Sequence, residues 1–512
     1  MPHRRVAVLG GGPGGLYAAR LLRLADPTCE VVVHEQGRPE ETFGFGVGLA
    51  AGTQRNLQAA DPDTLRDILA AGYRHDMTMR VGEDVVRVRN DHLVGVARTE
   101  LLAILQRHAE KAGARLEFGT RCAAQDLDAD VVVAADGVSS ATREAGDFGA
   151  TVDVGRGLYL WCAADFALHD AMFSPASTEH GTFVTHAYPY APTRSTFLIE
   201  TDEATWHRAG FDATTEATAA DATDEASLRY LERAFADRLD GHPLIGNRTR
   251  WLRFRTVHCE RWSDGRTVLL GDAAHTAHYS IGSGTKLAME DAIALVDALG
   301  EEQDTTSAFR RYEDVRRPSV ERLQELARRS QLWWESFPER MHLPVEQLMV
   351  AYMTRAGNVP LDRFAETAPD VVHAALEHYG DGAAPPGGIV EWVLDRPLHH
   401  GGRRRPDRRA TPADDGELVT IENVTTDPWD DDGDAAVARA RAARERGAAG
   451  VRLSGPAERG ALLTRLDLAE RIRTETGALT VVDGPEALRD DLAAGLVSAR
   501  TDLVALTAEE PA

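Results

Sequence analysis

The sequence has little cysteine. Its 512 residues include only four, Cys29, Cys122, Cys162 and Cys259, and no two of them form a Cys-x-x-Cys pair. Metal sites built on thiolates need clustered cysteines, and a disulfide framework needs many cysteines for the length of the chain. The sequence therefore predicts no metal site and no disulfide framework, and we expect the thiols to be reduced in the cytoplasm.

Positive charge and long apolar runs are also scarce. Lys and Arg number 57 against 81 Asp and Glu, which gives a formal net charge of −24. Because such a chain lacks the basic excess that neutralises phosphates, we expect no nucleic-acid partner. No apolar run approaches the ~20 residues of a membrane span, and the opening MPHRRVAVLGGG enters a strand pattern at once, which leaves no room for a signal peptide. We therefore expect a soluble, cytoplasmic protein without a membrane partner.

What the sequence does contain begins with a glycine-rich turn. The apolar run Val6–Leu9 leads into GGGPGG, a helix pattern follows, and a second apolar run ends just before Glu35. A βαβ unit with G-x-G-x-x-G and an acidic residue about 20 positions later is typical of dinucleotide binding. The glycines permit a tight turn and close approach of a diphosphate, and the acidic residue holds the adenosine ribose. The predicted contacts are Gly10, Gly12, Pro13, Gly14, Gly15, Glu35 and Gln36.

Two further turns have the same strand–loop–helix context. The run Val131–Ala135 closes at Asp136-Gly137, and Ser-x-x-Arg follows within SSATR. The run Val268–Leu270 ends at Gly271-Asp272 and continues through a polar, Gly-rich loop into an amphipathic helix pattern. Ligands of open α/β sheets bind at the carboxyl ends of the parallel strands, where helix starts offer free N–H groups. We therefore expect the three turns to meet at one edge of one sheet.

The segments between the turns do not continue as βα units, as they would in most NAD dehydrogenases. A Gly-aromatic loop, Phe43–Gly48, leads into strand-like segments, and Arg98 opens a helix pattern where it can reach cofactor phosphate or ribityl oxygens. Residues 159–200 alternate in polarity, which predicts antiparallel strands that roof a substrate pocket. Residues 203–240 have a helical composition.

The three turns together resemble a known family. GGGPGG with Glu35, ADGVSSATR and LLGDAAH occur in the order found in single-component, FAD-dependent aromatic hydroxylases of the para-hydroxybenzoate hydroxylase type. The resemblance implies an α/β fold in which a Rossmann-type FAD-binding domain is interleaved with an antiparallel-sheet substrate domain. It also implies tight, non-covalent FAD, NADH or NADPH as co-substrate, and O₂ that forms a C4a-hydroperoxide on the flavin. Asp136 and Gly137 would then serve FAD and NAD(P)H, Asp272 the ribityl chain, and the Gly282–Thr285 backbone, with Gly282, Gly284 and Thr285, the flavin ring.

One departure from the family pattern points to a subfamily. The family's turn after Gly-Asp has a Pro-Pro pair and ends in Gly-x-Asn, whereas this chain has His278-Tyr279-Ser280 and Thr285-Lys286. This turn, together with FGFGV and THAYPYAPTRSTF, resembles the hydroxylases of aryl-CoA thioesters. The resemblance implies an electron-rich ring carried as a CoA thioester. A carrier-bound aryl thioester is the alternative substrate, and a homodimer is one candidate assembly that the sequence leaves open.

A ring that bears a thioester is electron-poor, so hydroxylation needs an amino or hydroxyl donor elsewhere on it. Where that donor is a phenol, a nearby base assists by removing its proton. We expect His278, Tyr279 and Ser280 to be the catalytic cluster, because the resemblance places them beside the flavin loop. The other polar candidates are His275, His186 and Tyr188.

The C-terminal region changes in composition. Residues 1–380 form the predicted monooxygenase, with FAD-binding segments at about 1–150 and 260–320, a substrate sheet at about 151–259 and a helical segment at about 320–380. Residues 381–432, rich in Pro, Gly and Arg, are predicted to be a linker. Residues 433–512 then show a β/α repeat that resembles the last units of an old-yellow-enzyme-type barrel. That is far short of the roughly 250 residues of a whole barrel, so we expect a degenerate partial module without FMN.

Three enzymatic alternatives and one non-enzymatic alternative remain open. The same chemistry could act on a free aromatic acid or on a ring tethered to a carrier protein. A flavin-dependent halogenase has the same fold, but its Trp-x-Trp-x-Ile-Pro motif is absent from this sequence. A flavin-binding pseudoenzyme or scaffold would have lost the chemistry, yet all three FAD motifs are intact.

Overall fold

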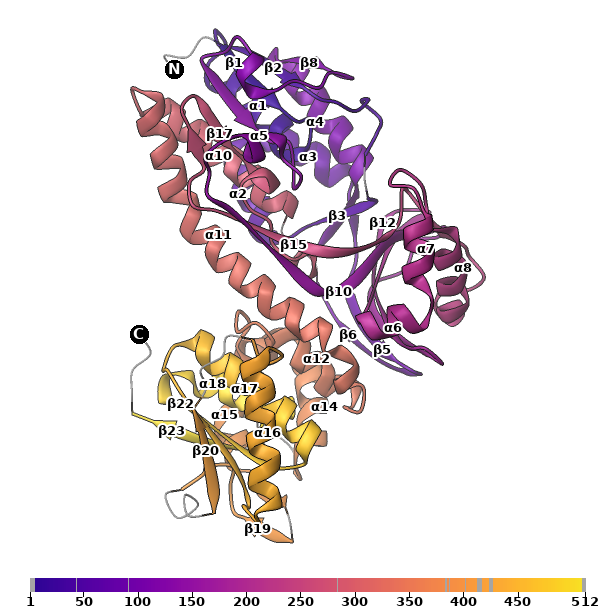
Figure 1. Ribbon diagram of the computed structural model, residues 1–512, viewed down its shortest axis with the longest axis vertical. Coiled ribbons are helices and arrows are strands. Elements are labelled where there is room, and N and C mark those ends of the chain that lie inside the picture. Colours follow the sequence, from indigo (N-terminus) through magenta and orange to yellow (C-terminus); the bar gives the residue numbers. More distant parts are fainter. Residues whose placement is uncertain are drawn as a thin grey trace. The chain divides into compact units, whose positions relative to one another are not determined.

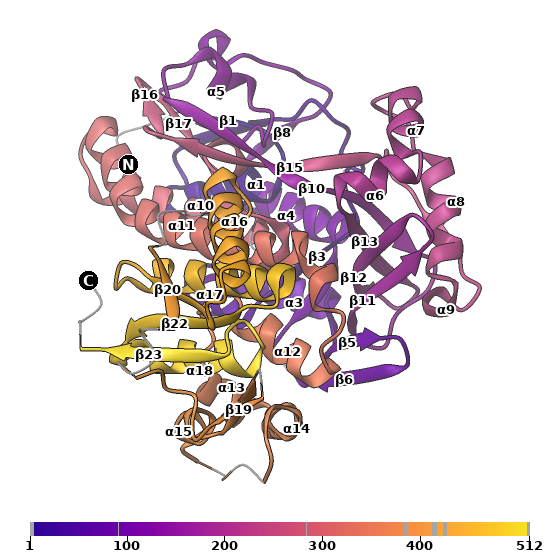
Figure 2. The same cartoon turned by 60° about the horizontal axis from the view of Figure 1, so that its bottom comes forward.

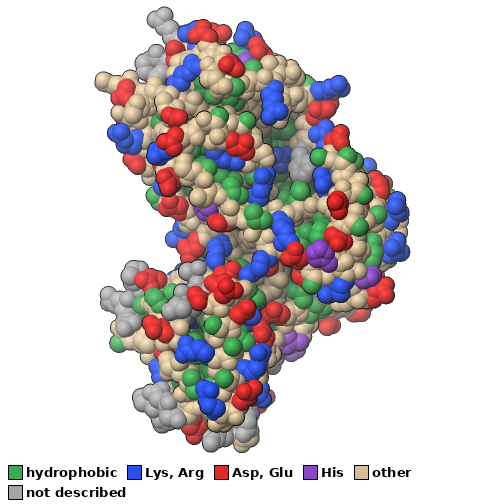
Figure 3. Space-filling model, in the orientation of Figure 1, with side chains coloured by type: hydrophobic (Ala, Val, Ile, Leu, Met, Phe, Trp, Pro, Cys, Tyr) green, Lys and Arg blue, Asp and Glu red, His purple; other side chains and the backbone are tan. Residues whose placement is uncertain are grey.

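The computed structural model describes residues 5–42, 44–90, 92–282, 284–382, 385, 387–400, 402–411, 417–422 and 427–508. Its contacts divide the chain into two compact units (Figure 1). The first comprises residues 1–82 and 89–335, and the second residues 83–88 and 336–512. No helix of the described ranges is long and apolar enough to cross a membrane. On the face drawn in Figure 3, acidic and basic side chains are interspersed rather than gathered by sign.

The first unit begins with a six-stranded sheet in the order β16-β17-β9-β1-β2-β8. Neighbouring strands are parallel except for the edge pair β16 and β17. The strands are short and almost wholly apolar in the centre, as expected for a sheet buried on both faces. The strands are β1 (Arg5–Leu9), β2 (Glu30–His34), β8 (Arg115–Glu117), β9 (Val131–Ala134), β16 (Ser263–Asp264) and β17 (Thr267–Leu269).

Helices cover this sheet and bring the three turns together. The strands β1, β9 and β17 are neighbours, so the turns that follow them lie at one edge, as the sequence predicts. The helix after β1 packs against the helix after β17 and against α4. The helices are α1 (Pro13–Ala25), α4 (Arg98–Ala112), α5 (Ala141–Ala145), α10 (Gly284–Glu301) and the long α11 (Thr305–Glu335).

A small sheet in the order β3-β7-β4 links this region to the rest of the first unit. Its strands are antiparallel, and the helices α2 and α3 pack against each other beside it. Its elements are β3 (Gly46–Leu49), α2 (Ala51–Ala60), α3 (Pro62–Ala71), β4 (Tyr73–Arg74) and β7 (Val94–Ala97).

The middle sheet is mainly antiparallel and has two different faces. Within the first unit its order is β14-β10-β13-β12-β11-β5, with β15 also paired to β10. Figure 1 shows β10 and β15 as a long ribbon that joins the two regions of this unit. The strands are β5 (Met77–Val81), β10 (Ala150–Ala164), β11 (Ala171–Thr178), β12 (Gly181–Ala191), β13 (Arg194–Thr201), β14 (Leu244–Ile245) and β15 (Trp251–Cys259).

One face of the middle sheet, the back face, is an apolar core. Leu160, Phe183, Phe197 and Ile199 pack there with aromatic and aliphatic residues of the helices. The opposite side, the front face, bears Tyr159, Trp161, His186, Leu198 and Glu200, because the pairs Tyr159–Glu200, Trp161–Leu198 and His186–Leu198 lie opposite each other across the strands. The helices behind the sheet are α6 (Glu203–Arg208), α7 (Phe211–Ala217), α8 (Glu225–Ala234) and α9 (Ala236–Leu239).

The second unit is built around four parallel strands in chain order, β20-β21-β22-β23. Helices α16 and α17 pack side by side next to β21 and β22 (Figure 2). The strands are β20 (Leu418–Glu422), β21 (Gly450–Ser454), β22 (Leu479–Pro485) and β23 (Leu503–Thr507). The helices are α12 (Val345–Thr354), α13 (Leu361–Thr367), α14 (Pro369–Tyr379), α15 (Ile389–Leu394), α16 (Asp431–Glu445), α17 (Arg459–Thr476) and α18 (Arg489–Val497), and β6 (Asp84–Val88) also belongs to this unit.

The predicted linker over residues 381–432 is wrong in its described parts. It contains α15, the hairpin β18 (Leu398–His400) and β19 (Arg403–Arg405), and the strand β20. Residues 408–410 also pair along β23, where the Ala410 N–H donates to the Val504 carbonyl. The prediction failed because this segment is rich in Pro, Gly and Arg overall. Its apolar helix, Ile389–Leu394, is short, and β20 and residues 408–410 pair with partners far along the chain. Residues 383–384, 386, 401, 412–416 and 423–426 lie outside the described ranges.

The predicted domain boundary at residue 380 also differs from the division by contacts, which falls after Glu335. Helices α12, α13 and α14 pack with α18 of the C-terminal region rather than as the tail of the first unit. The hydrophobic pattern of an amphipathic helix does not show which core the helix packs against. The sequence pattern alone therefore cannot locate this boundary.

Candidate active site

The first glycine-rich turn is shaped by two close backbone approaches. Gly10 has φ +101°, and a Cβ there would lie 2.2 Å from the Ala135 carbonyl oxygen. A Cβ at Gly15 would lie 2.1 Å from the Gly10 carbonyl oxygen, so both positions require glycine. At Gly12, in contrast, a Cβ would meet no atom within 4 Å. The turn is therefore closely packed at Gly10 and Gly15 and open at Gly12, where a diphosphate would approach the start of α1.

The neighbours of this turn complete a cradle. Pro13 is the first residue of α1, where its missing N–H costs no helical hydrogen bond. Gly14 packs so closely that a Cβ would lie 2.5 Å from Leu270, which ties the turn to the end of β17. Glu35 follows β2 and accepts hydrogen bonds from the Gly11 N–H at 2.6 Å and the Gly37 N–H at 2.7 Å. Its carboxylate is thus held in place with lone pairs left for a ribose, and Gln36 is exposed beside it.

Asp272 and Arg98 lie near each other at the turn after β17. Asp272 belongs to the short helical turn η2 (Gly271–Ala273), and Arg98 is the first residue of α4. Burial raises the pKa of Asp272, although its side chain remains reachable by solvent, while the charges of Arg98 and His275 lower it. The Arg98 Nε has no hydrogen-bond partner among the described residues. A cation and an anion with spare hydrogen-bonding capacity suit the phosphate and hydroxyl groups of FAD.

The loop before α10 lies beside Asp272. A Cβ at Gly284 would stand 3.8 Å from the Asp272 carboxylate oxygen, so the start of α10 and this carboxylate share one space. Gly282 has φ +62° with no atom near its side-chain position, and Thr285 lies in the first turn of the helix. Ser283, within the backbone segment expected to face the flavin, lies outside the described residues, as does Phe43 of the Gly-aromatic loop.

The Asp136–Gly137 turn has a structural task in addition to its predicted one. The Asp136 carboxylate accepts hydrogen bonds from the Ser140 hydroxyl at 2.5 Å and from the Thr142 N–H and hydroxyl, which fixes the start of α5. Gly137 has φ +82° and open space at its side-chain position. Arg143, which sequence reasoning left without a role, donates to the Ala273 carbonyl at 2.9 Å and so connects this turn to the Asp272 turn. The arginine at the end of SSATR was the signal for this link.

The predicted catalytic cluster separates into two roles. The His278 Nδ1 and the Ser280 hydroxyl are 2.9 Å apart, and the Ser280 hydroxyl is 2.7 Å from the Ser330 hydroxyl on α11. His278 and Ser280 therefore brace the turn against α11. Tyr279 instead extends to the front face, where its ring centroid lies 4.9 Å from that of Tyr159 and 6.1 Å from that of His186.

A buried carboxyl group, missed by sequence reasoning, receives the Tyr279 hydroxyl. Tyr279 hydrogen-bonds to Glu200 of β13, which is only 8% exposed. Burial raises the pKa of Glu200 to about 8, the hydrogen bond from Tyr279 lowers it, and the charge of Glu335 raises it further. The only sequence signal was the alternation along β13, which places Glu200 on the same side as Leu198.

Two of the other predicted polar candidates do not reach this cluster. His275 lies under the turn, where its Nε2 is 2.9 Å from the Asp291 carboxylate, which also pairs with Arg316 at 2.8 Å. Burial opposes the charge of Asp291, but His275 and Arg316 lower its pKa. The Tyr188 hydroxyl donates to the Gly46 carbonyl at 2.7 Å, which fixes the start of β3.

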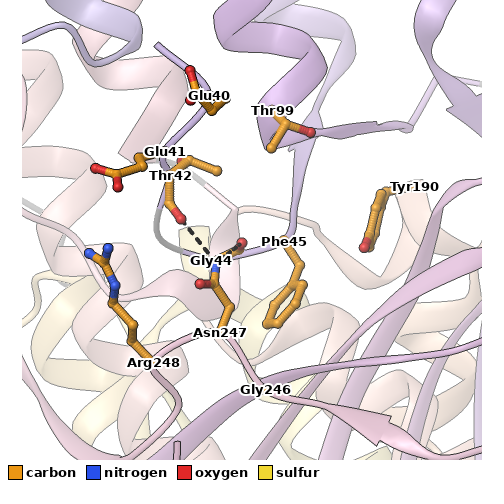
Figure 4. Close-up of a pocket in the computed structure, with 10 residues that line it drawn as sticks. All are labelled: Glu40, Glu41, Thr42, Gly44, Phe45, Thr99, Tyr190, Gly246, Asn247 and Arg248. Carbon is orange, nitrogen blue, oxygen red and sulfur yellow. Dashed lines mark hydrogen bonds between the residues drawn. The ribbon is translucent and has the colours of Figure 1, made fainter. Parts of the chain in front are cut away.

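A cavity of about 380 Å³ opens beside the same sheet. It lies among Glu40, Glu41, Thr42, Gly44, Phe45, Thr99, Tyr190, Gly246, Asn247 and Arg248 (Figure 4). The Asn247 amide donates to the Thr42 carbonyl at 2.9 Å, shown by the dashed line in Figure 4. A Cβ at Gly44 would stand 3.8 Å from Trp161, so the cavity adjoins the front face of the middle sheet. Its size is in the range of small-molecule sites.

Comparisons with known proteins agree with these features. Residues 123–327 match the model of a family described as FAD binding domain. The chain is 38% identical over 528 residues to salicyloyl-CoA 5-hydroxylase of a Streptomyces species, covering 98% of this chain and 99% of that protein. It is also 38% identical to 3-hydroxy-4-methyl-anthranilyl-[aryl-carrier protein] 5-monooxygenase of Streptosporangium sibiricum, covering 69% of this chain and 95% of that protein.

The fold has counterparts among solved structures. The tetrameric form of 2-methyl-3-hydroxypyridine-5-carboxylic acid oxygenase superposes with a TM-score of 0.52 at 18% identity, covering 73% of this chain and 97% of that chain. At this level of identity the likeness concerns the fold alone. It confirms the predicted arrangement, a Rossmann-type region interleaved with an antiparallel sheet.

Proposed function

The chain belongs to the FAD-dependent aromatic monooxygenases, and on this premise we propose that it hydroxylates an electron-rich aromatic ring carried as a thioester of coenzyme A. NADH or NADPH supplies the electrons and O₂ the oxygen atom. The observation that carries this proposal is the similarity to salicyloyl-CoA 5-hydroxylase over nearly the whole length of both chains. The relative named for a carrier-bound ring leaves about a third of this chain without a counterpart, which favours coenzyme A over a carrier protein.

The residues at the three turns fit FAD. The open side of Gly12 admits a diphosphate, Glu35 is oriented for a ribose, and Arg98 has an unpartnered buried nitrogen. Asp272 faces the same space from the end of β17 and is suited to ribityl hydroxyls. When bound, the flavin supplies electron transfer and oxygen activation. The chain's own task is to hold the flavin, orient the aromatic ring and exclude water.

The front face of the middle sheet is the proposed binding site of the substrate's aromatic ring. Tyr279 projects from the turn beside the flavin-binding residues towards Glu200 and Tyr159, so a ring held there lies between the flavin loop and the sheet. The cavity at Gly44 and Phe45 adjoins this face through Trp161 and offers a path for the extended arm of a thioester. His278 and Ser280 act as positioning residues that hold Tyr279.

A substrate panel tests this function. The holoenzyme is given NADH or NADPH with aryl-CoA thioesters, the corresponding pantetheine thioesters, carrier-protein thioesters and free aryl acids, and products are identified by mass. We expect the aryl-CoA thioesters to stimulate NAD(P)H oxidation most and to yield ring-hydroxylated products. Stimulation by free acids alone would refute the thioester assignment, and preference for carrier-bound rings would refute coenzyme A. Flavin binding without product from any substrate would mark a pseudoenzyme.

A further inference from the structure

One oxygen of the buried Glu200 carboxyl group lacks a hydrogen bond. The Tyr279 hydroxyl bonds to the group, but Oε1 has no hydrogen-bond partner among the described residues, and the His186 Nε2 atom lies 3.4 Å away without suitable geometry. Glu200 is 8% exposed, so bulk water does not compensate. Leaving a buried carboxyl oxygen unbonded costs free energy, and buried polar groups in proteins nearly always have a hydrogen-bond partner, from the protein, from water or from a ligand.

The surroundings of this oxygen suit a flat ring. The Tyr159 and Tyr279 rings lie 4.9 Å apart beside Glu200, and the His186 ring lies 4.0 Å from that of Trp334 at the end of α11. Phe173 of β11 closes the group, with its centroid 5.3 Å from that of His186. Aromatic walls with a few placed polar groups are the usual construction of a site that binds a small aromatic ligand.

We propose that Glu200 determines specificity by accepting, at Oε1, a hydrogen bond from a protic donor substituent of the substrate ring, a hydroxyl or an amino group. This inference rests on the proposed aromatic hydroxylation. A ring that bears a thioester is electron-poor, and an acceptor on its O–H or N–H group returns electron density to the ring. A methoxy group has no hydrogen to donate, so Glu200 would distinguish the hydroxylated ring from its methoxy analogue.

Tyr279 and the proposed ring substituent have separate tasks at Glu200. Tyr279 donates to the carboxyl group and fixes its orientation, while the turn braced by His278 and Ser280 holds Tyr279. If the carboxyl group served only to anchor Tyr279, a glutamine would serve equally well, since its amide oxygen accepts the same hydrogen bond. Glutamine has an NH₂ group, a donor, in place of one of the two carboxyl oxygens. It therefore impairs acceptance of a hydrogen bond from the ring substituent.

Four titratable groups face Glu200 from the elements packed against it. They are Tyr159 of β10, His186 of β12, Tyr279 of the turn and Glu335 of α11, which lies beside Arg156 at 3.5 Å. Ionised Glu200 accepts a hydrogen bond more strongly than the neutral acid. Because the pKa of Glu200 lies at about 8, the preference for a hydroxylated ring should grow as pH rises through that value.

The test compares matched ligands on the FAD-loaded enzyme. The 2-, 3- and 4-hydroxybenzoyl-CoA thioesters and their methoxy analogues are titrated against wild type, and the isomer that binds most tightly is kept. Binding is followed by the change in flavin absorbance, and kcat and KM are measured for the same compounds. Glu200→Gln is compared with Glu203→Gln, an exposed glutamate three residues further on, and with Tyr279→Phe.

At pH 9, where most of Glu200 is ionised because its pKa is about 8, we expect Glu200→Gln to weaken binding of the hydroxylated ring about tenfold, as for loss of a hydrogen bond to a charged group, with little change for the methoxy ring. Tyr279→Phe should change the preference in the same direction, and Glu203→Gln should leave it as in wild type. The preference of wild type should rise between pH 7 and 9, and that of Glu200→Gln should stay flat.

A hydroxyl-to-methoxy preference that is equal in wild type and Glu200→Gln, at every pH, would overturn the inference. If wild type accepts only free acids, the proposed thioester function fails, and the same comparison with hydroxybenzoates and methoxybenzoates still decides the role of Glu200. The two failures are therefore distinguishable.

Discussion

At the scale of single residues, the turn after η2 shows how one short stretch supports two functions. His278 and Ser280 hydrogen-bond within the turn and to Ser330, whereas Tyr279 reaches the carboxyl group of Glu200. The turn thus joins the edge of the first sheet that we propose binds the flavin to the front face of the middle sheet. Substitutions in it are expected to affect the use of bound flavin more than its binding.

Replacing His278 tests this division. In His278→Ala the side-chain contact to Ser280 is lost, and the T-shaped contact with Phe254, at 4.9 Å between centroids, is lost with it. We expect FAD content to stay near that of wild type, but product formed per NAD(P)H consumed to fall several-fold, with H₂O₂ released instead. The control is His258→Ala, a partly exposed histidine of β15. Unchanged turnover and coupling in His278→Ala would contradict the bracing role.

The raised pKa of Glu200 also predicts how the stability of the fold depends on pH. Its pKa rises from an ordinary 4.5 to about 8 in the folded protein, so the folded state retains a proton that the unfolded chain releases. The stability linked to this group is fully present below pH 4.5 and is lost as pH rises to about 8, a loss of up to about 5 kcal/mol at one pKa unit per ~1.4 kcal/mol. Glu200→Gln should therefore raise the unfolding temperature at pH 8 and have a smaller effect at pH 5. A gain of the same size at both pH values would contradict the shift.

At the scale of elements, the loop between β17 and α10 depends on a buried ionic network. The Asp291 carboxylate of α10 accepts the Gly271 N–H at 3.1 Å and pairs with His275 and Arg316. Asp291 thereby attaches the turn that contains Asp272 to α10 and α11, the two longest helices of the first unit. Breaking one member of a buried pair typically costs 3–5 kcal/mol, because the remaining charge has no partner.

Asp291→Asn should lower the unfolding temperature and release FAD at lower denaturant concentration than wild type. Burial raises the pKa of Asp291, but His275 and Arg316 lower it by more, so that the pKa in the folded protein lies below its ordinary value. The stability that ionised Asp291 contributes to the fold is therefore present above the ordinary pKa and is lost as pH falls. The difference between wild type and variant should therefore shrink below pH 4. Asp297→Asn, an exposed position on the same helix, is the control. Equal FAD release by Asp291→Asn and wild type would refute the supporting role.

The glycine-rich turns could be predicted from sequence because their constraints are local. Gly10 and Gly15 approach backbone atoms so closely that no side chain fits, and the pattern records this directly. The Glu200 cluster could not be predicted, because its members come from β10, β12, β13, a turn and the end of α11. Glutamate in a strand is also usually solvent-exposed, and only strand pairing shows that Glu200 is buried.

At the scale of the whole molecule, the chain is two units. Sequence periodicity predicted the alternating strands and helices after residue 433, since each element is long enough to show its period. It failed for residues 381–432 because α15 and β20 are short and their packing partners lie far away in sequence. The parallel order β20-β21-β22-β23 is compatible with consecutive strands of a barrel, and we propose that this unit is a partial β/α module without a flavin of its own.

Flavin content tests that proposal. The purified protein should contain one flavin per chain, released as FAD on denaturation, with no FMN detected by chromatography. Arg98→Met should lower the bound FAD without introducing another flavin, because it removes a charge beside Asp272. A second flavin per chain, or any stoichiometric FMN, would show that the C-terminal unit retains a cofactor site.

We propose that an aromatic ring on a CoA thioester receives an oxygen atom from O₂. The most direct measurement is mass analysis of the aryl-CoA product formed by the holoenzyme with NAD(P)H under ¹⁸O₂. We predict a product heavier than the substrate by one heavy oxygen atom, with the label on the aromatic ring and the thioester intact. Label found only in peroxide or water, or only on a free acid, would contradict hydroxylation of a CoA-bound ring.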